Sequence, residues 1–83
     1  MGRPLYYLAY RRGELKIYGI STEIRPVLRV RGAAADRMFR AVMGVLDGYG
    51  LAYEEERVEG ELVIGLPGDV GFAVTAYAVL AYG

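Results

Sequence analysis

The fold is decided first by residues 5–18, which read LYYLAYRRGELKIY. Two runs rich in tyrosine and aliphatic residues flank Arg12-Gly13, and such runs around a two-residue turn containing glycine predict a β-hairpin. Because strand side chains alternate between faces, this register pairs Tyr7 with Tyr18 on one side of the hairpin and places Leu8 on the other.

The next segment predicts a third strand and then a helix. Residues 24–31 alternate, with Arg25, Arg29 and Arg31 expected on one face and Ile24, Leu28 and Val30 on the other. Pro26 indicates an edge strand, or a strand that begins late, since proline cannot donate to a neighbouring strand. Residues 33–49 have apolar side chains at spacings of three and four, which is typical of an amphipathic helix. The expected core stripe consists of Met38, Ala41, Val42, Val45, Leu46 and Tyr49. Phe39 and Met43 lie outside this stripe and widen the apolar face.

A second hairpin and a second helix complete the chain. Residues 51–58 and 61–66 flank Glu59-Gly60, another turn pair. The register that pairs Arg57 with Leu62 directs one set of side chains to one face, namely Tyr53, Leu62, Ile64 and Leu66, and a second set to the other, namely Glu54, Glu56 and Glu61. Asp69 is expected to be the N-cap of a last helix that runs to about Tyr82. The sequence therefore predicts an α+β fold, in which an antiparallel sheet with the order βββαββα carries two helices on one face.

The length and composition restrict what this fold can do. The 83 residues are expected to form a single domain, residues 1–83, whose thin core favours association with a partner. The chain has no Cys, His, Trp, Asn or Gln, and only three hydroxyl residues other than tyrosine, namely Ser21, Thr22 and Thr75. We therefore expect no enzyme activity, no cofactor and no metal site.

The same composition indicates where the protein works. Avoidance of thermolabile side chains, together with abundant arginine, tyrosine and aliphatic residues, is typical of thermophile proteins. No targeting segment is evident, and the uncharged stretch of residues 70–83 is shorter than the roughly 20 residues that span a bilayer. We expect a cytoplasmic protein that does not bind membranes.

Charge is divided unevenly along the chain although the formal net charge is zero. Residues 1–46 carry nine basic and three acidic side chains, a net of +6, whereas residues 47–83 carry one basic and seven acidic side chains, a net of −6. This asymmetry indicates either a nucleic-acid-binding half or two complementary surfaces that meet within or between subunits.

The first three strands offer a candidate nucleic-acid face. Aromatic rings that stack on bases and cations that hold phosphates are the combination used to bind single strands. The expected members are Tyr7, Arg11, Lys16, Tyr18, Arg25, Arg29 and Arg31. RNA or single-stranded DNA is the implied partner, and the simpler alternative is a solvated face whose arginines pair with the acidic half of the chain.

The last helix is the stronger candidate because it has no polar face. A helix that is apolar all round must be buried or shared with a partner. Its small alanines allow close approach of another helix, and the expected oligomer interface consists of Phe72, Ala73, Ala76, Tyr77 and Leu80. We expect a homodimer, or a larger homo-oligomer, that serves as a protein-interaction module; a single-stranded nucleic-acid-binding protein is the alternative.

Two further patterns resemble ligand-binding sites but have simpler structural interpretations. Gly65, Gly68 and Gly71 resemble a phosphate-binding loop, but no lysine follows and Asp69 would repel an anion, so a turn is favoured. The run Glu54-Glu55-Glu56 could hold Mg²⁺, but a solvated strand face is favoured for such a run of like charges.

The order of elements resembles the secretion-chaperone-like fold of type III secretion chaperones and YbjN-type proteins without their first helix. The similarity lies in the hairpin at Gly13, the helix end at residues 46–48, the hairpin of residues 59–64, and Leu66-Pro67 before the last helix. The resemblance covers most of the chain and includes no catalytic motif. It implies a homodimer that binds another polypeptide, or a regulator without catalysis.

Overall fold

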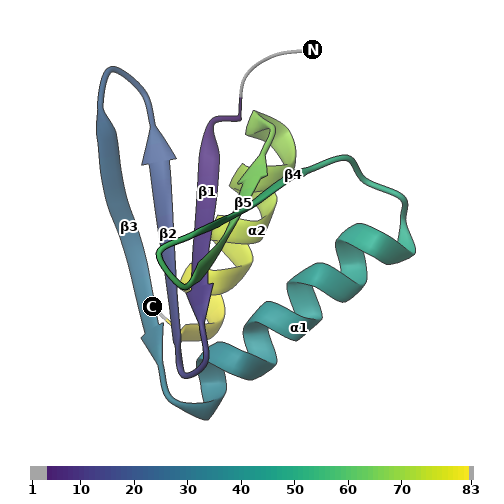
Figure 1. Ribbon diagram of the computed structural model, residues 1–83. Helices are drawn as coiled ribbons and strands as arrows, with labels where there is room; N and C mark the ends of the chain where they lie inside the picture. The colour runs from purple at the N-terminus through teal and green to yellow at the C-terminus, as the bar shows by residue number, and fades with distance from the viewer. Residues whose placement is uncertain (1–3, 83) are drawn as a thin grey trace.

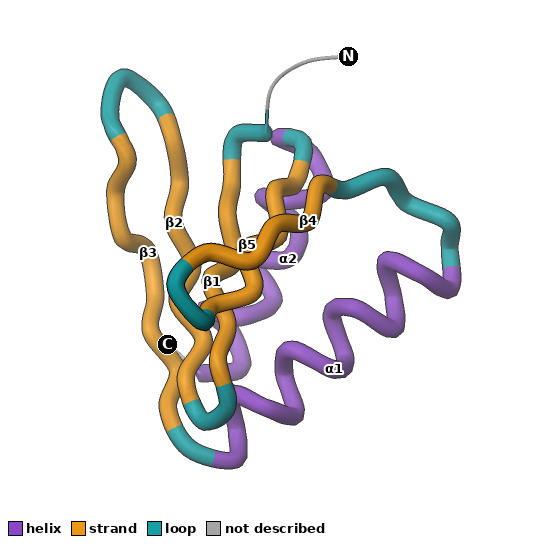
Figure 2. The backbone as a smooth tube through the Cα atoms, viewed as in Figure 1, coloured by secondary structure: helices purple, strands orange, loops and turns teal. Residues whose placement is uncertain are grey.

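The computed structural model describes residues 4–82. The strands are β1 (Tyr6–Arg11), β2 (Glu14–Ile20), β3 (Ile24–Arg31), β4 (Glu54–Val58) and β5 (Glu61–Leu66), and the helices are α1 (Ala33–Gly48) and α2 (Gly68–Tyr82). Figures 1 and 2 show the strands as one sheet, with α2 behind it and α1 crossing beside it. The structure confirms the predicted α+β fold and the order of its elements.

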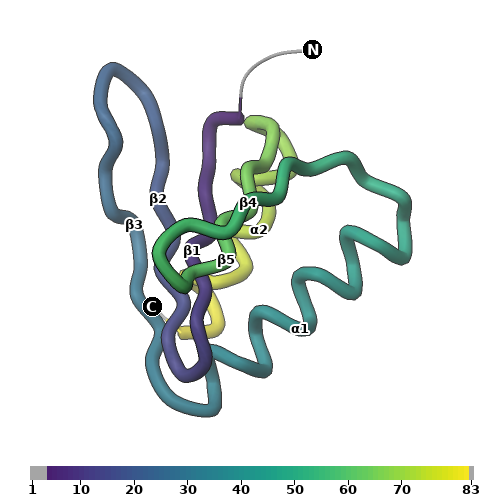
Figure 3. Tube along the Cα trace, viewed as in Figure 1, coloured from purple at the N-terminus to yellow at the C-terminus, as the bar shows by residue number. Residues whose placement is uncertain are grey.

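The five strands form one antiparallel sheet with the order β3-β2-β1-β5-β4. Strand β1 lies in the centre, because β5 pairs with the side of β1 that β2 leaves free (Figure 3). Both hairpin registers are as predicted, with Tyr7 opposite Tyr18 and Arg57 opposite Leu62. Positive φ angles at Glu59 (51°) and Gly60 (84°) are those of a type I′ turn, the turn that suits a two-residue hairpin.

Strand β3 is an edge strand, as predicted from Pro26, but a β-bulge changes its register. Leu28 lies opposite Ile17 and Pro26 lies opposite Tyr18, so Val27 is an extra residue between two pairs. The prediction that Arg25 shares a face with Arg29 and Arg31 is therefore wrong. The pairing of Arg25 with Gly19 puts it in register with the opposite face, where its guanidinium lies 3.3 Å from the Glu23 carboxylate.

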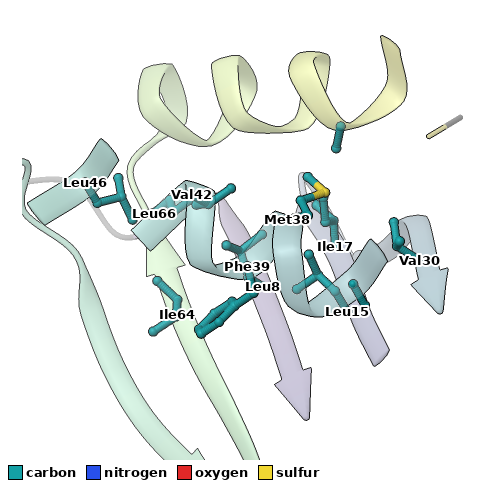
Figure 4. Packing of buried hydrophobic residues seen from close by; sticks show 12 residues of the cluster. Leu8, Leu15, Ile17, Val30, Met38, Phe39, Val42, Leu46, Ile64 and Leu66 are labelled. Carbon is teal, nitrogen blue, oxygen red and sulfur yellow. The ribbon is translucent and has the colours of Figure 1, made fainter. Parts of the chain in front are cut away.

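Both helices cover the same face of the sheet, and α1 supplies most of the helical part of the core. The side chains of Met38, Phe39 and Val42 lie among those of Leu8 and Ile64 in Figure 4. The remaining buried core residues are Leu15, Ile17, Val30, Ala35, Leu46, Leu66 and Ala78.

The Phe39 ring also stacks on the ring of Tyr10, with centroids 4.0 Å apart and planes 3° from parallel. The expectation that Phe39 lies outside the core stripe is wrong, because Phe39 is buried. Conversely, the sequence pattern predicts that Val45 lies in the core stripe, but its side chain is 53% exposed. The helix is rotated so that Phe39 can reach Tyr10.

Helix α2 lies against the sheet through its smallest side chains. Its buried residues are Gly71, Thr75 and Ala78. A Cβ added to Gly71 would lie 2.5 Å from Tyr6 Cβ and Cγ, closer than real Cβ atoms approach other atoms. Because no larger residue fits there, Gly71 fixes both the distance and the rotation of the helix.

The start of α2 differs from the prediction. The helix begins at Gly68, so Asp69 lies in its first turn and is not the N-cap. The Asp69 carboxylate accepts a hydrogen bond from Val70 N (2.9 Å), and Gly71 N donates to Pro67 O (2.7 Å). The helix therefore begins two residues earlier than an N-cap at Asp69 would give.

This packing predicts opposite effects of two glycine-to-alanine substitutions. We expect Gly71→Ala to destabilise the fold by about 1–3 kcal/mol, because the added methyl group must displace Tyr6. The matched control is Gly44→Ala in α1, where nothing lies within 4 Å of an added Cβ. It should stabilise the fold by about 0.5–1 kcal/mol through helix propensity. Urea unfolding measures both, and a Gly71→Ala protein as stable as the wild type would contradict the packing.

Candidate interaction surfaces

The large side chains of α2 point away from the sheet. Leu80 is 88% exposed, Phe72 65% and Tyr77 53%, and no residue from Val70 to Tyr82 is charged. Soluble monomers rarely leave contiguous apolar patches of this kind open, so such patches mark interaction sites.

An apolar groove lies between the two helices beside these side chains. It has a volume of about 350 Å³ and is lined by Ala41, Val42, Val45, Ala73, Val74 and Tyr77. A second hollow of about 250 Å³ shares Val45, Ala73 and Val74 and extends toward Leu51 and the charged Asp69. We call the groove and the outward side chains of α2 the helix layer; its members are Ala41, Val42, Val45, Leu51, Phe72, Ala73, Val74, Ala76, Tyr77 and Leu80.

The structure places the predicted interface residues together. Phe72, Ala73, Tyr77 and Leu80 are exposed and Ala76 is half-buried. At about 100° per residue, Ala73, Ala76 and Leu80 lie on the side of α2 opposite Gly71, and Phe72 and Tyr77 flank them. Sequence reasoning missed the contribution of α1. Ala41 and Val45 lie four residues apart in the apolar stripe of that helix. This spacing predicts that both lie in the core, but both residues are exposed.

The face of the sheet that the helices leave uncovered carries the predicted aromatic and basic residues, with the exception of Arg25. Cross-strand pairing places Tyr7 beside Tyr18 and Lys16 beside Arg29 on this face, which we call the sheet face. Arg11 and Arg31 lie on it as well, each opposite Glu14. Tyr7 also has a structural role, because its ring lies 3.1 Å from the position of a Cβ on Gly65.

Two carboxylates on the sheet face neutralise its cations. Glu61 Oε2 lies 3.0 Å from Lys16 Nζ and 3.5 Å from Arg11 Nε. Glu14 Oε2 lies 3.5 Å from Arg29 Nε and 3.9 Å from Arg31 Nε. The basic residues of the sheet face therefore form ion pairs with one carboxylate in the first hairpin and one in β5.

The ion pair between Lys16 and Glu61 shifts the pKa of both groups. The hydrogen bond from Lys16 lowers the pKa of the Glu61 carboxyl, and the hydrogen bond to Glu61 raises the pKa of Lys16. Both groups are therefore held in their charged forms. By contrast, Glu54 and Glu56 form no ion pair among the described residues, and strand order places them at the far edge of the sheet face.

The bulge in β3 opens a hollow on the sheet face. It has a volume of about 380 Å³ and is lined by Lys16, Tyr18, Pro26, Val27, Leu28 and Arg29. An aromatic ring, two cations and an apolar floor suit a planar anionic ligand. Both cations already have carboxylate partners, so such a ligand must compete with Glu14 and Glu61.

The three glycines at positions 65, 68 and 71 have packing roles. A Cβ on Gly65 would contact Pro4 and Tyr7, and one on Gly68 would lie 3.0 Å from Leu5 Cδ1. Together with the contact between Gly71 and Tyr6, these approaches show that the glycines accommodate the segment that leads into β1. The spacing that resembles a phosphate loop therefore reflects three close contacts with residues 4–7.

Other sites receive less support from the described part of the chain. Within residues 4–82, no three carboxylates lie close enough together to hold a metal ion. Neither α1 nor α2 is long and apolar enough to cross a membrane.

A hydrogen-bonded carboxylate joins the first hairpin to α1. The Tyr10 hydroxyl donates to Asp36 Oδ1 (2.6 Å), and Gly13 N donates to the same oxygen (2.7 Å). These bonds lower the pKa of the Asp36 carboxyl, with the Tyr10 bond as the largest cause, and the same bond raises the pKa of Tyr10. The network holds the helix that supplies one wall of the groove.

In comparisons with known protein families, curated proteins and solved structures, nothing matches the chain. The resemblance to the secretion-chaperone-like fold stays a prediction.

The Asp36 network predicts a pH-dependent stability. A carboxyl whose folded pKa is lowered stabilises the fold above its unfolded pKa of about 3.9, and this contribution is lost as the pH falls through the folded pKa. Tyr10, whose pKa is raised, contributes below its unfolded pKa of about 10 and loses that contribution as the pH rises through the folded value.

We therefore expect Asp36→Asn to be less stable than the wild type at neutral pH, with the difference closing in acid. Urea unfolding at a series of pH values measures the difference. Glu56→Gln, at an exposed β4 position without an ion pair among residues 4–82, is the control and should follow the wild type. A gap between wild type and Asp36→Asn that does not narrow as the pH falls below the unfolded carboxyl pKa of about 3.9 would contradict the role of Asp36.

Proposed function

We propose that this chain is a non-enzymatic protein-interaction module that docks through its helix layer. The observation that carries the proposal is the outward orientation of Phe72, Tyr77 and Leu80 on an uncharged helix. The groove beside them supplies a concave apolar surface that a side chain of a partner can fill. The composition further supports the cytoplasm of a thermophile as the setting.

The energetics favour a covered helix layer. Removing about 600 Å² of apolar surface from water contributes on the order of 15 kcal/mol before the entropy of association is subtracted. That gross gain exceeds the net stability of a typical small domain, about 5–15 kcal/mol. A chain of this size gains much of its stability from such a contact, because its own core is small.

Hydroxyl-radical labelling inside the cells that produce the protein tests the proposal without knowledge of the partner. Leu80→Glu places a charge on the helix layer at a position that is 88% exposed, so the fold should be retained. We expect labelling of Phe72 and Tyr77 to rise several-fold in this variant relative to the wild type, while labelling of Tyr18 on the sheet face stays the same. Equal, high labelling of Phe72 and Tyr77 in both proteins would show that nothing covers the helix layer.

A second candidate function is the binding of single-stranded nucleic acid, which the hollow at Tyr18 favours. The hollow combines a ring for stacking with Lys16 and Arg29 for phosphate contacts. Its support is weaker than that of the helix layer, because Glu14 and Glu61 already compensate these cations.

A filter-binding titration with single-stranded RNA and DNA at two salt concentrations tests this second candidate. If it is correct, binding weakens at higher salt and Glu14→Gln tightens it, because Arg29 and Arg31 lose their shared carboxylate. Tyr18→Leu should weaken it, and Arg37→Gln, on the outer surface of α1, should leave it unchanged. Absence of binding, or binding that does not respond to salt, removes the candidate.

A further inference from the structure

We infer that a second copy of this chain occupies the helix layer, with its α2 packed antiparallel to α2 of the first copy about a two-fold axis between Ala76 and Tyr77. The inference rests on the proposed function and names the partner. It depends on how large and small residues alternate along the exposed side of α2.

The exposed side of α2 is self-complementary in the antiparallel direction. A two-fold axis between residues 76 and 77 places Leu80 of one copy opposite Ala73 of the other. Tyr77 and Ala76 are about 100° apart around the helix, so they lie on opposite flanks of this contact and each faces its own counterpart in the other copy. The large Leu80 side chain therefore meets the small Ala73, and this contact occurs twice because the interface is isologous. Alanines at the contact allow the helix axes to approach to about 8 Å, the short end of the usual range.

The groove extends this complementarity to α1. Ala73 lines the groove together with Ala41 and Val45, so a Leu80 side chain placed opposite Ala73 enters the groove from the partner. Leu80 is 88% exposed within its own chain and is free to do so. Each copy then supplies one projecting leucine and one groove, as a closed dimer requires.

The size and charge of the surface fit a copy of the chain. Leu80, Phe72, Tyr77 and Val45 are each more than half exposed. Since one aromatic side chain can bury about 150–250 Å², covering this patch removes an area of the same order as the about 800 Å² per partner in a standard interface. No charged residue lines the groove or lies between Val70 and Tyr82. Two copies can therefore meet across a two-fold axis without bringing like charges together.

Sedimentation equilibrium of three variants tests the arrangement. The wild type should be a dimer at micromolar concentration. Leu80→Glu and Ala73→Lys should each raise the dissociation constant by about 30-fold or more, as expected when a central interface contact is lost. Val58→Glu, at a β4 position that is 42% exposed and outside the helix layer, should remain a dimer.

Mixing the two weakened variants gives the decisive measurement. A heterodimer of Leu80→Glu with Ala73→Lys contains one Glu–Lys contact and one native Leu80–Ala73 contact, so it should form where neither variant dimerises alone. Circular dichroism of each variant checks that it is folded; a variant that unfolds as a monomer should regain structure on mixing.

The outcomes separate this inference from the proposed function. A wild-type chain that stays monomeric, while labelling in cells shows the helix layer covered, would overturn the second copy as occupant and leave the docking surface intact. A wild-type dimer that tolerates Leu80→Glu and Ala73→Lys would place self-association elsewhere. Failure of the two weakened variants to associate on mixing would overturn the antiparallel register.

Discussion

The contact between Gly71 and Tyr6 is the constraint on which the surface of this molecule depends. Because the helix backbone approaches the tyrosine ring so closely, only the narrow side of α2, which includes Thr75 and Ala78, can face the sheet. The large side chains of α2 then have to lie on the opposite side. The apolar groove, whose second wall comes from α1, is a consequence of the same rotation.

The two helices consequently contribute to stability in different ways. Helix α1 buries Met38, Phe39 and Leu46 and is held to the first hairpin by Asp36, so its position is fixed by its own chain. Helix α2 adds only Ala78 to the buried apolar core, although it is the more apolar of the two helices. Val70 and Val74 pack against the core, but the exposed side chains of Phe72, Tyr77 and Leu80 contribute little to the stability of the monomer.

Local sequence patterns predicted the elements and both hairpin registers, because turn residues and strand alternation act over a few residues. They could not predict the bulge that separates Arg25 from Arg29, since Val27 resembles any other strand residue. They also could not predict which side of α2 faces the sheet. A helix that is apolar all round has no preferred face, so a contact with Tyr6, sixty-five positions earlier in the chain, decides which side chains are exposed. The α1 wall of the groove was missed for a related reason, since Val45 fits a core stripe equally well.

The sheet order also explains how a chain with oppositely charged halves avoids a strongly polarised surface. The basic hairpin of β2 and β3 lies at one edge and the acidic strand β4 at the other, an arrangement that would favour edge-to-edge association between copies. Glu14 lies within the basic region, and Glu61 reaches it from β5 to contact Lys16 and Arg11. These two carboxylates reduce the charge separation across the sheet face. Pro26 and the bulge further disrupt the β3 edge as a template for pairing. Lateral association through the sheet is thereby limited, whereas the groove between the helices has no charged lining residue and can be covered with little desolvation of charge.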